Sequence, residues 1–548
     1  MRDFPSPLVE GSPSVPPWRP KILLLLVLLC LAPRAWQAYH WDILWGDTVA
    51  YLRASEALEK GDLDRAFLEF GLNIYPVILT GLRHLGLDWE TTGKWWSVLM
   101  ATATVVPLWG WIRRQFDDRI AVAACICYAL HGKLVAISPL IIRDPTFWFL
   151  FASTLYAMWR AVVEIRLRWF LAAGVALTLA VHIRTEGWLL AIPLIGWSAG
   201  RWQAAAGSRR RLAAGAALCL AVIFLPAVIV NATLLRGHPR WELVRSQHVR
   251  IIWDWWRGAA PAQGPAPGNN GDAASRGETA SSSETGKHKL AASPFQPARS
   301  SRRAFDSKLV SRLLRGFTYS GGLLTLVGLT SGWRIFFRRE HITLLVLNLF
   351  LIATIQIRSG QEGIDLRYFM PMVCTALPWM ALGYFQLVDW MASPMRRCDV
   401  WTPGRQKILA GVLAVMAATA SMAEAGLPAA AIMHRNAVLG RWIFDRLGPQ
   451  QLITGNFGGA GLVTYYAQGD YAGVFDRRHN GDEDVPPVVT SRQADLIVLA
   501  WDAADRRDYI AWVESQLTSQ WGYWHVPREQ LPEECEPFDV FVRSDKAW

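Results

Sequence analysis

The chain has 548 residues, of which 52% are hydrophobic and 29 are tryptophan, and its mean hydropathy is positive. This composition excludes an ordinary soluble globular protein, because apolar runs of roughly 17 to 25 residues recur as in a polytopic helical membrane protein. The net charge of +11 does not indicate nucleic-acid binding, because Lys and Arg cluster between the apolar runs, as in loops that face anionic lipid. The seven cysteines are scattered, so we expect neither a disulfide scaffold nor a zinc site.

Hydropathy predicts about eleven transmembrane helices within a membrane domain that covers residues 21–427. The proline-rich residues 1–20 before it are expected to be a disordered cytoplasmic N-terminus. The predicted spans are residues 21–39, 94–112, 119–137, 146–163, 169–183, 187–200, 212–234, 317–333, 341–357, 368–390 and 408–427.

Every second connection between these spans is basic, which is the pattern of cytoplasmic loops. The other connections then lie on the extracytoplasmic side, including a first outer loop at residues 40–93. A later outer loop, residues 235–316, contains residues 258–304, which lack a hydrophobic pattern and are expected to be disordered. The basic connections are Arg113–Arg114, Arg160–Arg168, Arg201–Arg211, Arg334–Arg339 and Arg396–Lys407.

The sequence pattern of residues 428–548 is typical of a small extracytoplasmic α/β domain and not of further transmembrane spans. Short β-branched and aromatic runs predict strands at residues 452–454, 461–466, 495–500 and 540–542. Helical patterns cover residues 435–447 and 506–518.

Ionisable side chains gather at the outer ends of the predicted spans, where they form a candidate site. Each of them also has an ordinary structural explanation. Asp47 and Asp144 suit helix N-termini, Arg184 and Glu186 can neutralise each other, and Lys94 can anchor a span at the interface. Their shared side of the membrane favours a functional role. The candidates are Asp47, Lys94, Arg143, Asp144, Arg184, Glu186, Arg367 and Tyr368.

Short motifs containing these residues follow one another in a fixed order. They are Trp45-Gly46-Asp47 with Tyr51, Gly61-Asp62, Tyr75-Pro76, Lys94, Ile142-Arg143-Asp144-Pro145, Arg184-x-Glu186-Gly187 and Arg367-Tyr368-x-x-Pro371. In this order they resemble the GT-C superfamily of polyprenyl-phosphate-sugar-dependent glycosyltransferases. The closer resemblance is to its family-39 group, the protein O-mannosyltransferases and lipid A aminoarabinose transferases. This chain departs from the group in two places, with Lys94 where relatives usually have Arg and a single carboxylate at Asp47-Thr48 where many have Asp-Glu.

The resemblance implies a membrane enzyme that transfers a hexose or pentose from a polyprenyl-phosphate carrier to an acceptor on the extracytoplasmic side, with inversion in a single displacement. It implies that Asp47 is the general base and that Asp144 orients the acceptor or binds a metal. It leaves a divalent metal open as a cofactor, since family members differ. The implied substrate-binding residues are Arg143, Lys94, Arg184, Glu186, Arg367, Tyr368 and Tyr75.

The expected partners are the lipid-linked sugar donor, a lipid, glycan or protein acceptor, and membrane lipids, without nucleic acid. The short loops and compact C-terminal region favour a bacterial inner membrane. Two alternatives belong to other classes. A lipid or solute transporter or flippase would also have many spans, but its polar groups usually lie near the membrane midplane. An envelope scaffold would use the bundle only as an anchor.

Overall fold

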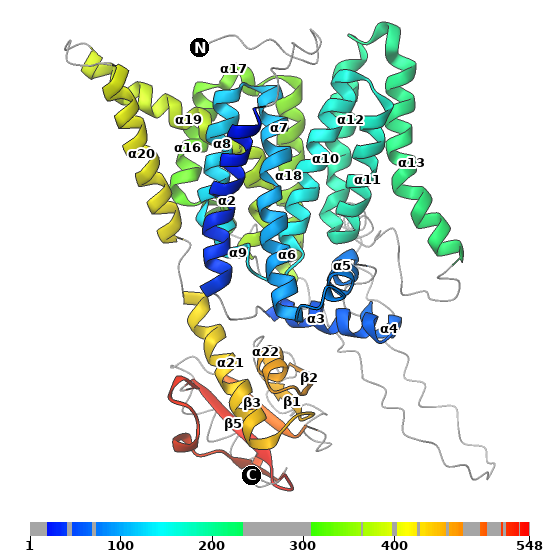
Figure 1. Ribbon diagram of the computed structural model, residues 1–548, viewed down its shortest axis with the longest axis vertical. Coiled ribbons are helices and arrows are strands. Elements are labelled where there is room, and N and C mark those ends of the chain that lie inside the picture. The colour runs from blue at the N-terminus through cyan, green and yellow to red at the C-terminus, as the bar shows by residue number, and fades with distance from the viewer. Residues whose placement is uncertain are drawn as a thin grey trace.

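The computed structural model describes residues 19–40, 46–67, 73–233, 308–362, 365–396, 403–424, 428–455, 460–474, 494–500, 517–518, 522–535 and 537–546. A bundle of long helices stands above a smaller domain built around a β-sheet (Figure 1). Residues 1–18 and 258–304, for which we predicted disorder, lie outside the described residues, and so does most of the helix predicted at 506–518.

Long helices build the bundle, and each of the eleven predicted spans is mainly helical where it is described, with a break between α8 and α9 inside the span predicted at 119–137. The helices are α2 (Pro20–His40), α6 (Trp89–Ala103), α7 (Val105–Gln115), α8 (Asp118–Leu130), α9 (Gly132–Ile137), α10 (Asp144–Glu164), α11 (Leu167–Ile183), α12 (Ala191–Trp202), α13 (Arg209–Thr233), α16 (Tyr319–Ser331), α18 (Arg339–Glu362), α19 (Met370–Arg396) and α20 (Pro403–Glu424).

Six stretches of the described chain are long and apolar enough to cross a membrane. They are Pro20–His40, Trp89–Gln115, Asp144–Glu164, Arg339–Gln356, Leu366–Ser393 and Gly404–Ala423. The predicted class, a polytopic α-helical membrane protein, is therefore confirmed. The number of eleven crossings stays a prediction.

Close helix contacts hold the bundle together. Helices α16 and α19 cross at Gly328 and Gly383, where an added Cβ would collide with the Trp379 carbonyl and the Leu324 carbonyl respectively. Such small residues let two backbones approach closely, which is the usual means of helix association in lipid. Large aromatic side chains fill the interior instead of water. Among the described residues, five tryptophans are fully buried, namely Trp109, Trp111, Trp148, Trp159 and Trp197.

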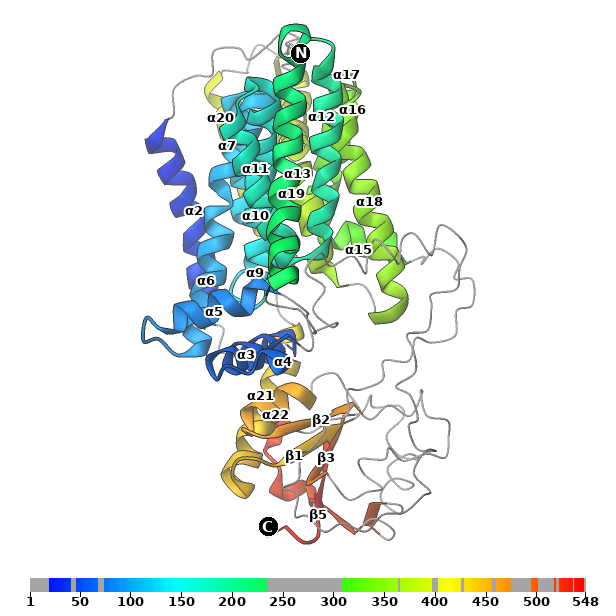
Figure 2. The same ribbon diagram turned by 90° about the vertical axis from the view of Figure 1, so that its right-hand side faces the viewer.

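Short helices cover one end of the bundle, which we call the site end. They are α3 (Gly46–Glu59), α4 (Leu63–Ala66) and α5 (Ile74–Arg83), together with α15 (Lys308–Gly316) and the 3₁₀ turns η1 (Thr185–Leu190) and η3 (Leu366–Phe369). The α7–α8, α10–α11 and α12–α13 connections, with η2 (Ala206–Ser208), and α17 (Trp333–Phe336) lie at the opposite end (Figures 1 and 2). The basic connections thus lie away from the site end.

The C-terminal domain contains a five-stranded sheet in the order β2-β1-β3-β5-β4. Strands β1 (Leu452–Gly455), β2 (Asp470–Val474) and β3 (Leu496–Ala500) are parallel, whereas β5 (Phe538–Arg543) runs antiparallel to both β3 and β4 (Tyr523–His525). Two further 3₁₀ turns, η4 (Arg528–Gln530) and η5 (Glu533–Cys535), precede β5. The predicted α/β character is confirmed. The strands β2 and β4 were not predicted.

The strand predicted at residues 461–466 is wrong, because these residues belong to helix α22 (Ala460–Tyr466). Its composition favours a strand, but β1 and β2 are parallel neighbours, and parallel strands need a crossover connection. Helix α22 lies within that crossover, and it packs against α21 (Pro428–Leu447), where Gly440 has no room for a Cβ beside the Val463 carbonyl. Tertiary connectivity therefore overrides local propensity here.

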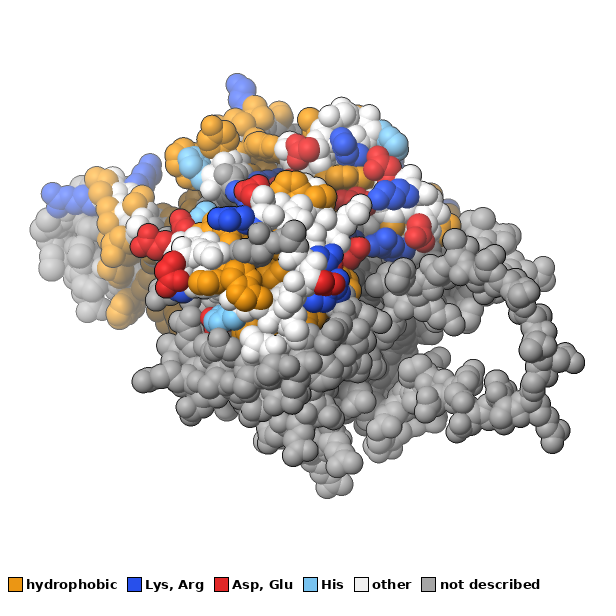
Figure 3. All heavy atoms as spheres, turned by 90° about the horizontal axis from the view of Figure 1, so that it is seen from below, with side chains coloured by type: hydrophobic (Ala, Val, Ile, Leu, Met, Phe, Trp, Pro, Cys, Tyr) orange, Lys and Arg blue, Asp and Glu red, His pale blue; other side chains and the backbone are white. Residues whose placement is uncertain are grey.

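The C-terminal domain contacts the site end through α22. Leu462 is fully buried in the same apolar cluster as the bundle core, and Tyr465 and Tyr466 pack against that cluster. Arg53 of α3 donates to the Gly469 carbonyl at 3.3 Å. Viewed from this side, the described surface mixes acidic, basic and hydrophobic side chains (Figure 3). The helix that begins at Asp47 is thus held between the bundle and the C-terminal domain (Figure 2).

Candidate active site

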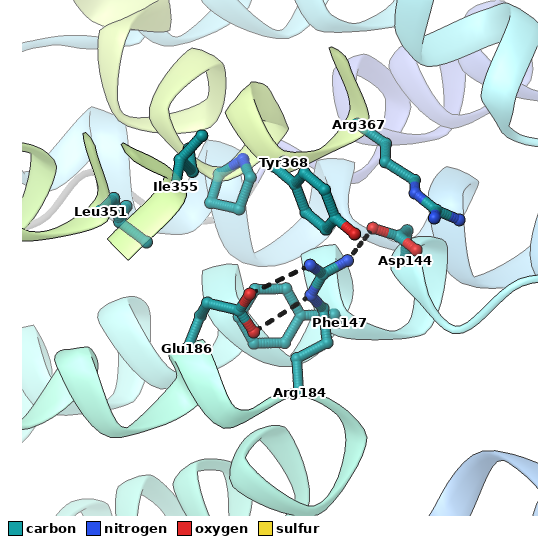
Figure 4. Close-up of a pocket in the computed structure, with 9 residues that line it drawn as sticks. Asp144, Phe147, Arg184, Glu186, Leu351, Ile355, Arg367 and Tyr368 are labelled. Carbon is teal, nitrogen blue, oxygen red and sulfur yellow. Dashed lines mark hydrogen bonds and ion pairs between the residues drawn. The ribbon is translucent and has the colours of Figure 1, made fainter. Parts of the chain in front are cut away.

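A small pocket at the site end collects residues from five separate parts of the chain (Figure 4). The cavity has a volume of about 10 Å³, which is room for about one water molecule. One part of its lining is apolar and another is charged. The lining residues are Asp144 and Phe147 of α10, Arg184, Glu186 of η1, Leu351 and Ile355 of α18, Arg367 and Tyr368 of η3, and Pro371 of α19.

Arg184 is the buried cation at the centre of this pocket. Its Nη2 and Nε contact the two oxygens of Glu186 at 3.1 and 3.3 Å, and its Nη1 forms an ion pair with Asp144 (Figure 4). Burial lowers its pKa, but the charges of Asp144 and Glu186 outweigh this and hold the pKa above its ordinary value. The guanidinium also lies 4.8 Å from the Tyr368 ring centre. Arg184 is therefore permanently charged and fully neutralised.

Arg367 is a second cation, and it joins three segments far apart in the sequence. Its Nη2 lies 2.6 Å from the Asp47 carboxylate of α3, and its Nε lies 3.0 Å from Asp365. Asp365 also caps η3 by accepting the Arg367 backbone N–H at 3.1 Å. In Figure 4 the Arg367 guanidinium points toward Asp144. The structure thus brings Asp47, Asp144 and Arg367 together, as predicted.

Asp47 is the most accessible carboxylate of this group. Its side chain is 41% exposed, compared with 3% for Asp144 and 8% for Glu186. It lies in the first turn of α3, where the helix dipole favours a negative charge. An exposed carboxylate beside a buried pair of cations can receive a proton from an incoming group, whereas Asp144 is enclosed by Arg184.

Tyr51 and Asp365 are central residues that our predicted site omitted. Tyr51 lies one helical turn after Asp47 and is buried, and Arg143, Asp47, Asp144 and Arg367 all act on its hydroxyl. Burial, with Asp47 and Asp144, raises its pKa to about 12. Burial also raises the pKa of Asp365. The charges of Asp144 and Asp47 raise this pKa further, and the charge of Arg367 lowers it. Tyr51 stands in a quoted motif, and its four-residue spacing from Asp47 was the available signal. Asp365 lies two residues before the quoted Arg367-Tyr368 motif.

Four predicted residues lie outside the pocket lining: Asp47, which adjoins it through Arg367, and Arg143, Tyr75 and Lys94. Arg143 lies 6.0 Å from the centre of the Tyr51 ring, and Tyr75 meets the same ring edge-on at 5.1 Å. Both therefore adjoin the site through Tyr51. Lys94 lies on α6 one turn after Glu90, on which its charge acts, and Glu90 in turn bonds to Tyr465 of α22. Lys94 thus lies toward the contact between the bundle and α22 of the C-terminal domain. We had predicted it as a phosphate ligand in the pocket.

The loop that leads to Asp144 is held by Arg34 of α2. Arg34 is fully buried, and its nitrogens donate to the carbonyls of Cys30, Tyr128 and Ala129 at 2.9 to 3.2 Å and to the Ser138 hydroxyl at 3.0 Å. Tyr128 and Ala129 lie at the C-terminal end of α8, where unpaired carbonyls and the helix dipole attract a cation. Arg34 therefore holds the break between α8 and α9 in place, and with it the segment from Ser138 to Asp144.

The site brings cations and carboxylates together. The cations can bind an anion, and a carboxylate can accept a proton. Arg184, Arg367, Asp144 and Glu186 line the pocket, and the carboxylates of Asp47 and Asp365 lie beside it, each paired with Arg367. Within the described ranges, no group of three or more His, Cys, Asp or Glu side chains has the arrangement of a metal site.

A helical bundle followed by a small C-terminal sheet domain is the architecture that the resemblance to the GT-C glycosyltransferases led us to expect. Residues 75–231 match the model of the dolichyl-phosphate-mannose-protein mannosyltransferase family. That segment includes Tyr75, Lys94, Asp144 and Arg184, whereas Asp47 and Arg367 lie on either side of it. No curated protein sequence matches the chain.

Solved structures show the same fold. ArnT from Cupriavidus metallidurans bound to undecaprenyl phosphate has 14% identity and a TM-score of 0.56, and the match covers 96% of this chain and 98% of that one. The oligosaccharyltransferase AglB from Archaeoglobus fulgidus, in complex with an inhibitory peptide and a dolichol-phosphate, has 11% identity and a TM-score of 0.54 over 96% of this chain and 74% of that one. At these identities the matches show a shared fold, which confirms the predicted fold class.

Proposed function

We propose that the protein transfers a sugar from a polyprenyl-phosphate carrier to an acceptor, by a single displacement with inversion at the sugar. The observation that carries this proposal is that Asp144, Arg184 and Arg367 line one pocket with an apolar side, while Asp47 pairs with Arg367 beside it. A lipid-linked sugar phosphate needs both a charged and an apolar surface, because its phosphate binds cations and its isoprenoid chain packs against apolar side chains. Undecaprenyl phosphate in ArnT and dolichol-phosphate in AglB are ligands of that chemistry.

Arg184 and Arg367 are the proposed phosphate ligands. Arginine suits this role because its planar fork can bind two phosphate oxygens at once. The phosphate is also the leaving group, and cations that stabilise its developing charge lower the barrier without acid catalysis. Leu351, Ile355 and Phe147 line the same pocket and suit the first isoprene units of the chain. Tyr368 lies over Arg184 and helps to hold it.

Asp47 is the proposed general base. The acceptor hydroxyl attacks the anomeric carbon, the bond from that carbon to the phosphate oxygen breaks, and Asp47 takes the hydroxyl proton. Its exposure makes it the carboxylate that an acceptor can reach. Asp144, enclosed by Arg184, is better placed to hold that arginine than to touch the acceptor, which revises the role that the resemblance implied.

We further propose that the reaction takes place on the extracytoplasmic side of a bacterial inner membrane. The basic connections lie at the opposite end of the bundle, and the positive-inside rule assigns that end to the cytoplasm. The C-terminal domain, residues 428–548, would then be extracytoplasmic beside the site. The acceptor in this proposal is a lipid, a glycan or a protein.

The test is transfer by the purified protein in detergent. Polyprenyl phosphates carrying radiolabelled hexoses or pentoses are incubated with envelope fractions, and products are separated from the lipid donor. We expect label in a new glycosidic bond with inverted anomeric configuration, and none with Asp47→Asn. Vectorial movement of the intact lipid in vesicles without a new bond would instead establish a flippase and refute the proposal.

A further inference from the structure

Arg367 already has two anionic partners, and they hold it differently. Asp365 is local, because one of its oxygens caps the backbone of η3 while the other contacts Nε at 3.0 Å. Asp47 comes from a distant helix and contacts the outer nitrogen, Nη2, at 2.6 Å. Asp47 is also more exposed than Asp365, at 41% against 33% of the side chain. Of the two contacts, the one to Asp47 is therefore easier to replace.

A third anion cannot simply be added to this arrangement. Arg367 and Arg184 are each paired with two carboxylates, and the cavity between them is the size of a water molecule. Burial raises the pKa of Asp365, and the nearby charges of Asp144 and Asp47 raise it further, as expected where acids crowd together. A phosphate therefore has to take the place of a carboxylate.

We propose that Asp365 is a positioning residue that anchors Arg367, so that the outer nitrogens of Arg367 can exchange Asp47 for the donor phosphate and thereby release Asp47 as the base. This inference rests on the proposed function and adds to it an order of events. In the resting protein Arg367 holds Asp47. The donor phosphate takes over that arginine, and Asp47 becomes free to accept a proton from the acceptor.

The charge balance of the reaction matches this exchange. A lipid–phosphate–sugar donor carries one negative charge on its phosphodiester. When the acceptor oxygen bonds to the anomeric carbon, the electron pair of the broken carbon–oxygen bond moves to the phosphate, which gains a second charge. The acceptor proton goes to the Asp47 carboxylate, which loses its charge. Arg367 thus exchanges a carboxylate for a phosphate before the chemical step, and in that step the phosphate becomes more negative while the released carboxylate is neutralised.

Binding of undecaprenyl phosphate to the purified full chain in detergent tests the exchange without any transfer. Asp47→Asn removes the competitor for Arg367, so it should tighten binding of this probe by about two- to fivefold, the range of a partly exposed ion pair. Asp118→Asn is the matched control, because Asp118 pairs with Arg113 at 2.9 Å at the opposite end of the bundle. The control should leave binding unchanged.

A double-mutant cycle tests the anchoring role of Asp365. Asp365→Asn keeps an oxygen for the η3 cap but loses the charge on Nε, so Asp47 becomes the main ionic partner of Arg367. Removing Asp47 should then tighten probe binding more in the Asp365→Asn background than in the native one. Asp365→Ser, which also keeps a capping oxygen, should reproduce this non-additivity. A merely structural role would change binding equally in both backgrounds.

Equal or weaker binding by Asp47→Asn would overturn the exchange, as would a comparable gain in Asp118→Asn. An additive cycle would overturn the anchoring role. The proposed transfer activity is judged separately: if the binding results hold but no donor yields a glycosidic bond, the phosphate exchange stands and the enzyme assignment falls.

Discussion

Arg184 provides the most direct test of the site, because it is a single buried cation that neutralises two buried carboxylates. In Arg184→Met the side chain keeps much of its length and loses its charge. Asp144 and Glu186, only 3% and 8% exposed, then lose their shared partner. Neither carboxylate can turn to bulk water without moving α10 or η1, on which they lie.

Removing one partner of a buried ion pair costs about 3–5 kcal/mol, because it leaves an uncompensated buried charge. Here one substitution uncovers two carboxylates, so we expect about 5 kcal/mol, a large part of the ordinary net stability of about 5–15 kcal/mol. Arg184→Lys keeps the charge but cannot meet Asp144 and both oxygens of Glu186 in one plane. For that variant we expect a smaller loss of about 1–3 kcal/mol.

The measurement is the fraction of detergent-purified protein that stays monodisperse after heating, with chemical unfolding where the transition is reversible. Arg184→Met should lose stability most at neutral pH and recover part of it as the pH falls, because protonation removes the uncompensated charges. Glu186→Gln is the control, since it leaves Arg184 paired with Asp144. A methionine variant as stable as the native protein at neutral pH would refute the ion-pair geometry.

Three further substitutions address other parts of the molecule. Asp47→Asn should reduce transfer by about 10²–10⁴-fold with normal expression, as expected on loss of a general base, and measurable transfer near the native rate would rule out that role. Arg34→Met should lower the free energy of unfolding by about 2–5 kcal/mol, because the Ser138 hydroxyl and three carbonyls lose their hydrogen-bond donor. Native-like stability of this variant would contradict the contacts described. Gly383→Ala should strongly reduce the yield of folded protein, since the Leu324 carbonyl of α16 occupies the space that a Cβ needs, whereas Gly411→Ala on the open face of α20 should have little effect.

Local patterns were enough to predict the elements and the side of the bundle on which the site lies. Asp47 was expected to cap a helix that begins at Thr48, and the structure has α3 over Gly46–Glu59 with Asp47 in its first turn. The prediction at residues 461–466 failed for the converse reason, since a strand-like composition lies in the crossover between parallel strands. Local propensity carries no information about which strands become neighbours.

By itself, the sequence determined that this is a polytopic membrane protein whose ionisable residues gather at one end, because apolar length and loop charge are properties of contiguous segments. Only the tertiary structure decided the pairings. That Arg367 holds Asp47, that Arg184 is shared by Asp144 and Glu186, and that Lys94 lies toward Glu90 depend on how distant helix ends meet. Ion pairing acts over a few ångströms in space, and no period or motif within one segment encodes a partner that another helix delivers.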